Sequence, residues 1–269
     1  MLKDITIGQY FPGNSVIHRM DSRFKIVLDI LYVVILFVAD NFISLAVAGI
    51  FILMAYAVSE IKPVMMLKSL KPLMPLILFT AILNLFFVSG TGEPLVKWWV
   101  ITVYWEGIST AIFMIVRIVC LIIGMSLLTY TTSPIVLTDA IERLLSPLKR
   151  IKLPVHELAM IMTIALRFIP TLIEETDKIM SAQKARGADL DTGGLMKRAK
   201  ALIPILIPLF VSAFKRANEL AMAMECRCYR GGDGRTKLRQ LKAKPMDYMI
   251  AMLMLTVLGF VILNNVVFS

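Results

Sequence analysis

Long blocks of apolar residues run through this chain, and they decide what kind of structure it can form. They lie at about 26–39, 42–58, 73–88, 107–130 and 246–268, and 58% of the 269 residues are hydrophobic. A transmembrane helix needs about 20 mostly apolar residues, so blocks of this kind can cross a bilayer. The first two are joined only by Asp40-Asn41, which predicts an antiparallel helical hairpin. We therefore expect an all-α membrane protein with about five transmembrane helices.

The basic residues predict how these helices are oriented. The chain has 29 Lys+Arg against 19 Asp+Glu, and Lys and Arg are retained on the cytoplasmic side of membrane proteins. They gather before the first block, after the second (Lys62, Lys68 and Lys71) and between the fourth and the last. The expected organisation in the cell membrane is a cytoplasmic leader (1–25), four transmembrane helices (26–130), a cytoplasmic coupling domain (131–245) and a last transmembrane helix (246–269) that ends outside.

Several functions are disfavoured by the motifs of the chain. No basic run is interleaved with aromatic residues, which argues against nucleic-acid binding. Cys226 and Cys228 do not predict a metal site, because zinc needs about four ligands and the only histidines are His18 and His156. No G-x-x-x-x-G-K-[ST] sequence occurs, so ATP, if it is used, is hydrolysed by another chain.

The segment before the last span is predicted to hold three amphipathic helices. Apolar residues recur at helical spacing over 134–149, 155–183 and 199–228, with charged residues on the opposite face. Pro170, Pro204 and Pro208 are expected to kink or break them. Three roles stay open: lying in the membrane interface, packing on each other, or docking another membrane protein.

The two long amphipathic helices end alike. One ends in Ala185-Arg186-Gly187 and the other in Cys226-Arg227-Cys228, so each places one arginine between small residues. Small neighbours let a helix end enter a groove, where a guanidinium can bind an acidic partner through two hydrogen bonds. The alternative is an arginine that only complements the negative end of the helix dipole before a C-cap. Two copies favour docking on two equivalent partners.

One charge is predicted deep in the membrane. Arg117 follows Glu106 by eleven residues in the fourth block, which corresponds to a depth of about 16 Å. Asp29, just inside the first span, is the expected partner in a structural ion pair.

The two arginine motifs resemble the X-R-X signatures of the transmembrane T component of energy-coupling factor (ECF) transporters. The leader is similar to the start of that family, from Gly8-Gln9-Tyr10 and Pro12-Gly13 to the run His18-Arg19-Met20-Asp21-Ser22-Arg23-Phe24-Lys25. The family usually has Pro in place of Ser22 and often Ala in place of Cys226, and neither departure touches the arginines. The resemblance covers essentially the whole chain.

This resemblance implies a non-catalytic scaffold. Arg186 and Arg227, with their neighbours in the two motifs, would contact two ABC-type ATPases that bind the ATP and magnesium, so the chain itself would bind no cofactor. The amphipathic helices would hold a membrane-embedded substrate-binding S component, which topples to release a vitamin or a metal ion. The residues expected to seat it are Met160, Met162, Phe168, Met180, Phe210, Met222 and Met224. Methionine adapts to exchangeable partners, although it also fills membrane helices.

Alternative functions remain at this stage. A T component dedicated to cobalt or nickel uptake is one, although the Gly8-Gln9-Tyr10 leader favours the shared, vitamin-serving type by resemblance. A self-contained secondary transporter or channel would show repeats within its membrane helices, whereas the repeated motif lies in the insert. A membrane-bound enzyme is disfavoured because no nucleophile–base or carboxylate cluster is apparent.

Overall fold

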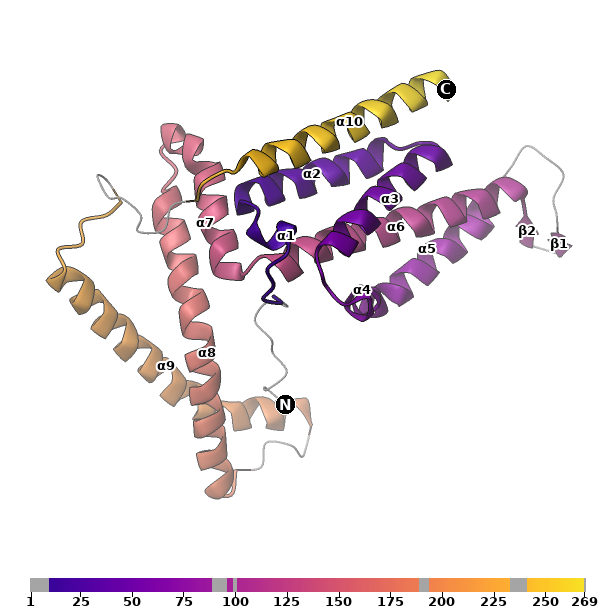
Figure 1. The fold of residues 1–269 in the computed structure, drawn as a ribbon. Helices are drawn as coiled ribbons and strands as arrows, with labels where there is room; N and C mark the ends of the chain where they lie inside the picture. The colour runs from indigo at the N-terminus through magenta and orange to yellow at the C-terminus, as the bar shows by residue number, and fades with distance from the viewer. Residues whose placement is uncertain (1–9, 89–95, 99–100, 189–193, 233–240, 269) are drawn as a thin grey trace. The chain divides into compact units, whose positions relative to one another are not determined.

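A computed structural model describes residues 10–88, 96–98, 101–188, 194–232 and 241–268 (Figure 1). The chain divides into two compact units, one made of residues 8–140 and 241–269 and the other of residues 1–7 and 141–240. Gly8 and Gln9 of the leader and residues 89–95 lie outside the described residues. The expectation of an all-α fold is confirmed, with one short hairpin of strands added to it.

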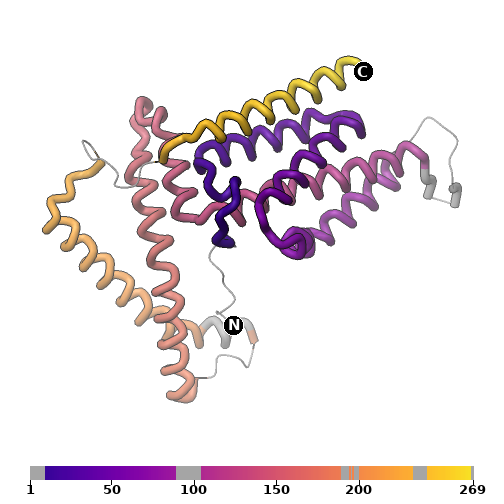
Figure 2. Tube along the Cα trace, viewed as in Figure 1, coloured from indigo at the N-terminus to yellow at the C-terminus, as the bar shows by residue number. Residues whose placement is uncertain are grey.

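The first unit, called the membrane unit here, is a layered bundle (Figures 1 and 2). Its long helix α6 packs against α2, α3, α4 and α5, and α10 packs against α2 and α3. Buried residues such as Tyr32, Ile35, Leu45 and Ile123 form the shared core. The elements are α1 (Val16–Arg19), α2 (Ser22–Val38), α3 (Phe42–Val58), α4 (Pro63–Leu70), the 3-10 helix η1 (Lys71–Leu73), α5 (Met74–Phe87), β1 (Val96–Trp98), β2 (Ile101–Val103), α6 (Trp105–Thr131) and α10 (Pro245–Phe268).

The expected hairpin of α2 and α3 is confirmed, but the expected loop after α3 is wrong. Lys62 caps the start of α4, Lys68 lies inside α4, and Lys71 begins η1, so this segment is helical. Proline is tolerated in the first turn of a helix because its missing N–H would have no partner there. Pro63, Pro72 and Pro75 each stand in such a first turn, so the segment from 63 to 87 is one long apolar helix.

Among the described residues, five helices are long and apolar enough to cross a membrane, but they are not the five that were expected. Three coincide with expected spans: Pro63–Phe87, Trp105–Thr131 and Pro245–Val267. The other two, Val155–Ala185 and Lys200–Cys226, are the least apolar of the five and belong to the expected cytoplasmic domain. Helices α2 and α3 have 17 residues each, about 25 Å at 1.5 Å per residue, which is the short limit for a span.

The leader is joined to the end of α6 by a buried lysine. Lys25 Nζ donates hydrogen bonds to Thr131 O at 2.9 Å, Thr132 Oγ1 at 3.1 Å and His18 O at 3.5 Å, which uses all three of its protons. Asp21 caps α2 by accepting from the Arg23 backbone N–H at 2.9 Å, and it also pairs with the Arg23 guanidinium at 2.6 Å. These contacts explain why a charged leader packs closely against the end of α6.

Replacing this lysine should destabilise the fold. In a Lys25→Met variant the Thr131 carbonyl, at the end of α6 where no helical donor reaches it, loses its partner. We expect the free energy of unfolding to fall by about 2 kcal/mol, measured by thermal unfolding of the detergent-purified chain. Lys68→Met, at an exposed position of α4, is the control and should change it by less than about 0.5 kcal/mol. Equal effects would contradict a structural role for Lys25.

The second unit is built on two long helices. Helix α7 (Pro134–Leu145) begins in the membrane unit and ends in the second, and the 3-10 helix η2 (Ser146–Ile151) leads from it into α8 (Val155–Ala185), which is followed by α9 (Leu195–Cys226). Helices α8 and α9 are in contact, and Glu175 of α8 accepts hydrogen bonds from the Ser212 hydroxyl and from the Arg216 guanidinium, the latter at 2.9 Å. The expected helices are therefore present, with slightly different ends.

The three prolines do not break these helices. Pro170 lies within α8, and Pro204 and Pro208 lie within α9, each helix continuing through them. Pro208 has no N–H to donate to the carbonyl of Pro204, four residues earlier. The Gln183 side-chain amide donates to that carbonyl at 3.4 Å, so a side chain of α8 partly satisfies the backbone of α9.

Candidate coupling site at two helix ends

The end of α8 is closed by a Schellman motif centred on Arg186. The Ala188 N–H donates to Gln183 O at 3.0 Å, and the Gly187 N–H donates to Lys184 O at 3.0 Å. These are the two reversed hydrogen bonds that define the motif, and they require a residue with positive φ directly after the C-cap. Gly187 fills that position with φ 85°. Arg186 is thus the C-cap residue of α8.

The end of α9 has the same hydrogen-bond pattern. The Tyr229 N–H donates to Met224 O at 3.0 Å and the Cys228 N–H donates to Glu225 O at 2.8 Å. Arg227 is the C-cap residue, and Cys228 has φ 56°, a left-handed conformation that costs a side-chain-bearing residue about 1–2 kcal/mol. Arg186 and Arg227 therefore occupy the same position of the same motif, although their neighbours differ.

Both arginine motifs are exposed. All six residues of the two motifs are accessible to solvent: Ala185, Arg186, Gly187, Cys226, Arg227 and Cys228. Within the described part of the chain, no hydrogen bond or ion pair engages either guanidinium. The last carbonyls of each helix are partly satisfied by the motif itself, so both arginines are available to an external acceptor such as a carboxylate.

The chain that follows Arg227 is held against the start of α8. The backbone at Gly232 lies so close to His156 that a Cβ there would come within 2.2 Å of the imidazole ring. The ring is held in turn by Glu142, whose carboxylate lies 3.0 Å from His156 Nδ1. The sequence offered little to find this arrangement, because two glycines after a helix indicate only where the helix ends and His156 was considered only as a metal ligand. These contacts position the Arg227 turn within its unit.

Few apolar residues of α8 and α9 are buried in the described structure: Val155, Ala159 and Ile205. On α9 the exposed large residues recur every three or four positions and cover a broad face, called the α9 apolar face here: Leu202, Ile203, Leu206, Ile207, Phe210, Val211 and Phe214. Phe210 and Phe214 are 61% and 68% exposed. Contiguous exposed apolar surface of this kind marks a protein or membrane contact.

The residues expected to seat an S component differ in their exposure to solvent. Met162, Phe210 and Met222 are exposed, whereas Met160, Phe168, Met180 and Met224 are partly buried. Ile203, Ile207 and Val211 were missed, because a single amphipathic stripe was assumed and the exposed apolar arc of α9 is wider. On α8 the exposed apolar residues are Leu158, Ile161 and Met162.

The expected ion pair between Asp29 and Arg117 is not formed. Arg117 donates to the carbonyl of Ala39, at the end of α2, and its guanidinium lies over the Phe113 ring, 4.6 Å from the centroid. Ala39 follows Asp29 by ten residues, which is about 15 Å along a helix. The carbonyls at a helix end carry partial negative charge and have no donor in the next turn, so the Ala39 carbonyl can accept from Arg117 in place of a carboxylate. The buried Nε of Arg117 has no hydrogen-bond partner among the described residues.

The two Schellman motifs allow a paired test of backbone strain. Gly187→Ala should destabilise the last turn of α8 by about 1–2 kcal/mol, because alanine is disfavoured at positive φ and no atom lies within 4 Å to clash with its Cβ. Cys228→Gly should stabilise the end of α9 by about 0.5–1 kcal/mol, since glycine removes that penalty but loses more chain entropy. Amide hydrogen exchange at each helix end measures both changes. Shifts of the same sign would contradict the shared motif.

The described residues contain no group of three or more His, Cys, Asp or Glu side chains placed to hold a metal ion. Cys226 and Cys228, the pair considered from the sequence, are exposed free thiols on either side of Arg227. The chemical groups that stand out in the second unit are thus two arginines and an apolar face.

Comparison with known proteins agrees with the all-helical fold and its membrane-length helices, because the relatives are membrane components of transporters. Residues 13–238 match the CbiQ family, described as "Cobalt transport protein". The energy-coupling factor transporter transmembrane protein EcfT of Clostridium kluyveri is 54% identical over 266 residues, covering 99% of this chain and 98% of that protein. The EcfT protein of Ruminiclostridium cellulolyticum is 50% identical, covering 100% of this chain and 100% of that protein. The EcfT protein of Bacillus subtilis is 46% identical, covering 97% of this chain and 98% of that protein.

The chain therefore belongs to the CbiQ family and is a transmembrane T component of energy-coupling factor transporters. The resemblance noted from the X-R-X motifs and the leader is confirmed.

Proposed function

We propose that this chain is the scaffold and coupling subunit of an ECF-type ABC importer for vitamins or other micronutrients. Arg186 and Arg227 dock into two ABC-type ATPases, which bind ATP and magnesium and hydrolyse the nucleotide. Helices α8 and α9 hold a membrane-embedded substrate-binding S component and transmit the movement of the ATPases to it. The chain has no catalytic residue of its own.

One observation carries this proposal. Two helices end in the same Schellman motif, each with an exposed arginine at the C-cap position whose guanidinium makes no hydrogen bond or ion pair to the described residues. Capping alone does not need arginine, because the backbone of the motif already closes the helix. Two equivalent cationic ends on one chain match two copies, or two homologues, of one acidic groove.

The proposed topology keeps the second unit in the cytoplasm. Helices α8 and α9 carry charged residues along their length, including Glu175 and Arg216, which pair between the helices. Helices α2 and α3, although short, pack with α6 and α10 in the membrane unit and are the better candidates for spans. The N-terminus is then cytoplasmic and the C-terminus outside, and the basic segments gather on the cytoplasmic side.

A second candidate is a T component dedicated to cobalt or nickel, which the description of the matched family as "Cobalt transport protein" favours. The relatives described above are named for the energy-coupling factor transporter without a metal. Uptake of radiolabelled cobalt and of radiolabelled vitamins by cells that express the complex distinguishes the two. Cobalt uptake that depends on this chain, without uptake of any vitamin, would favour the dedicated type.

The proposal is tested by purifying the tagged chain from its native host. Two ATPase subunits and a small membrane protein should be recovered with it in fixed proportion. The matched control is an Arg186→Ala/Arg227→Ala chain, which should retain the small membrane protein and lose the ATPases. Recovery of the native chain alone, with transport activity, would instead support a self-contained transporter.

A further inference from the structure

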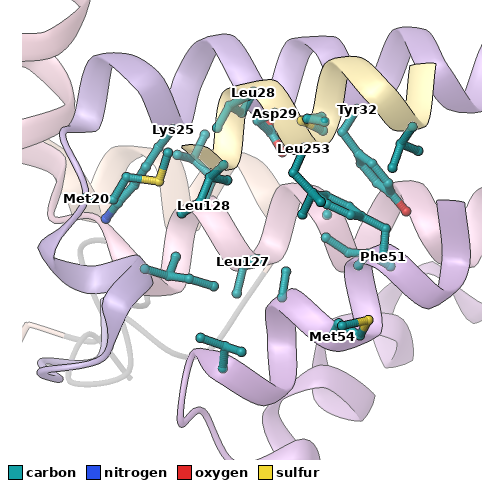
Figure 3. A pocket seen from close by; sticks show the side chains of 18 of the residues that line it. Met20, Lys25, Leu28, Asp29, Tyr32, Phe51, Met54, Leu127, Leu128 and Leu253 are labelled. Atoms are coloured by element: carbon teal, nitrogen blue, oxygen red, sulfur yellow. The ribbon is translucent and has the colours of Figure 1, made fainter. Parts of the chain in front are cut away.

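A cavity of about 470 Å³ lies within the membrane unit, between α1, α2, α3, α6 and α10 (Figure 3). Its wall is almost wholly apolar, with Leu28, Phe51, Met54, Leu127 and Leu253 among the residues that line it. This volume is within the range of small-molecule sites in proteins. The coupling function proposed above does not use it.

The cavity exists because α3 and α10 are held together at one end only. Ser44 accepts from Asn264 Nδ2 at 2.9 Å and donates to Asn265 Oδ1 at 3.2 Å, and Asn265 also donates to Val38 O. Towards the other end the two helices diverge, as the ribbon shows (Figure 1). The stretches that line the cavity, from Val47 to Val58 and from Ile250 to Val257, begin about one turn after Ser44 and end about two turns before Asn264. A wedge therefore opens between them.

The rim of the wedge is apolar and exposed. Ile50, Met54 and Val58 of α3 are 58%, 64% and 50% exposed, and Leu253 of α10 is 55% exposed. In a multi-pass membrane protein, such residues on the outside of a bundle face hydrocarbon. The wedge is therefore open to the acyl chains of the bilayer rather than to water.

One residue in the wall of the cavity, Asp29, carries a polar carboxyl group. Asp29 lines the cavity, and in the described part of the chain no hydrogen bond or ion pair engages its carboxylate. Lys25, one helical turn earlier, already donates its three protons elsewhere, and Arg117 is bound to the carbonyl of Ala39. A carboxylate at this depth without a partner is costly, so the occupant is expected to supply a donor.

We propose that the cavity binds one acyl chain of a phospholipid with a primary amine headgroup, whose ammonium donates to Asp29. Asp29 lies three residues inside the predicted first span, about 4–5 Å, close to the boundary between headgroups and acyl chains. A choline headgroup has no N–H to donate, and an anionic glycerol headgroup brings a second negative charge to the carboxylate. The charge and the hydrogen-bond requirement together select the amine.

The test uses the full chain, delipidated in detergent, with dioleoyl phosphatidylethanolamine, phosphatidylcholine or phosphatidylglycerol added and bound lipid counted by native mass spectrometry. One phosphatidylethanolamine per chain is expected, with affinity at least about tenfold above that of phosphatidylcholine, as one charge-assisted hydrogen bond implies. Asp29→Asn should abolish most of this preference while acyl-chain binding remains. Equal affinities in the native chain, or an unchanged preference in Asp29→Asn, would overturn the proposal.

Two further variants test the location. Ala55→Phe places a ring in the cavity and should lower binding of all three lipids, whereas Met252→Phe, on α10 but outside the lining, should not. Thermal unfolding of each variant confirms that it is folded. A photoreactive residue at Met54 should capture lipid in the intact complex. Capture of a protein helix instead would show that the wedge is a subunit contact and would contradict the lipid site.

Discussion

An Arg186→Ala/Arg227→Ala chain is expected to insert normally and to lose ATP-dependent uptake. Neither guanidinium is engaged within the described part of the chain, so the substitutions remove no internal contact and leave both helix caps in place. Truncating one partner of a hydrogen-bonded charge pair at an interface costs about 2–5 kcal/mol, and the proposed function puts one such pair at each of two interfaces. Uptake of labelled substrate into cells or vesicles, together with recovery of the ATPases, measures the effect.

The single variants and a matched control make this result specific. Each single alanine should weaken the binding of ATPases, and Arg→Lys should give an intermediate loss, because an ammonium cannot make the two parallel hydrogen bonds of a guanidinium. Arg167→Ala removes another exposed arginine of α8, away from the helix end, and should leave uptake unchanged. Full uptake by the double variant would refute the coupling role of the two arginines.

A Phe210→Ser/Phe214→Ser chain should lose its S component while it keeps the ATPases. The two rings lie one turn apart on the α9 apolar face and are 61% and 68% exposed. Burying such a ring contributes about 1.5–3 kcal/mol, so losing two should weaken a contact on this face by more than about 100-fold. Co-purification of the small membrane protein from detergent measures the loss.

The control for this variant uses the polar side of the same helix. Glu219→Ser changes an exposed residue that follows Phe210 by nine positions, which places it on the opposite side of the helix, and it should leave the complex intact. If the phenylalanine variant kept its S component, the α9 apolar face would not be the seat of that subunit. If it lost the ATPases as well, the defect would lie in the fold of the second unit.

Much of the fold could be read from local patterns. The positions of α2, α3, α6 and α10 follow from runs of apolar residues, and those of α8 and α9 follow from apolar residues at helical spacing. The helix ends at Arg186 and Arg227 were recognisable because small residues and glycines follow the apolar pattern. Such features depend on neighbours within a few positions of the chain, so one sequence is enough to find them.

It was harder to predict from the sequence which helices span the membrane. Helices α8 and α9 pass the same requirements of length and apolar character as the other three long apolar helices among the described residues, and the hairpin α2–α3 falls at the short limit. Composition along one helix does not say what that helix packs against. The contacts of α2 and α3 with α6 and α10 supply this information, because they join residues that are far apart in the chain.

The residue patterns alone were sufficient for the helical class, the family resemblance and the paired arginine motifs, since each is written in short stretches of sequence. Tertiary structure decided the partners. Arg117 binds the end of α2 rather than Asp29, and Lys25 joins the leader to the end of α6. The Pro204 carbonyl of α9, which has no helical donor because Pro208 lacks an N–H, accepts a hydrogen bond from Gln183 of α8. Polar groups buried in an apolar fold bind whichever donor or acceptor the packing brings within reach, and that depends on the whole chain.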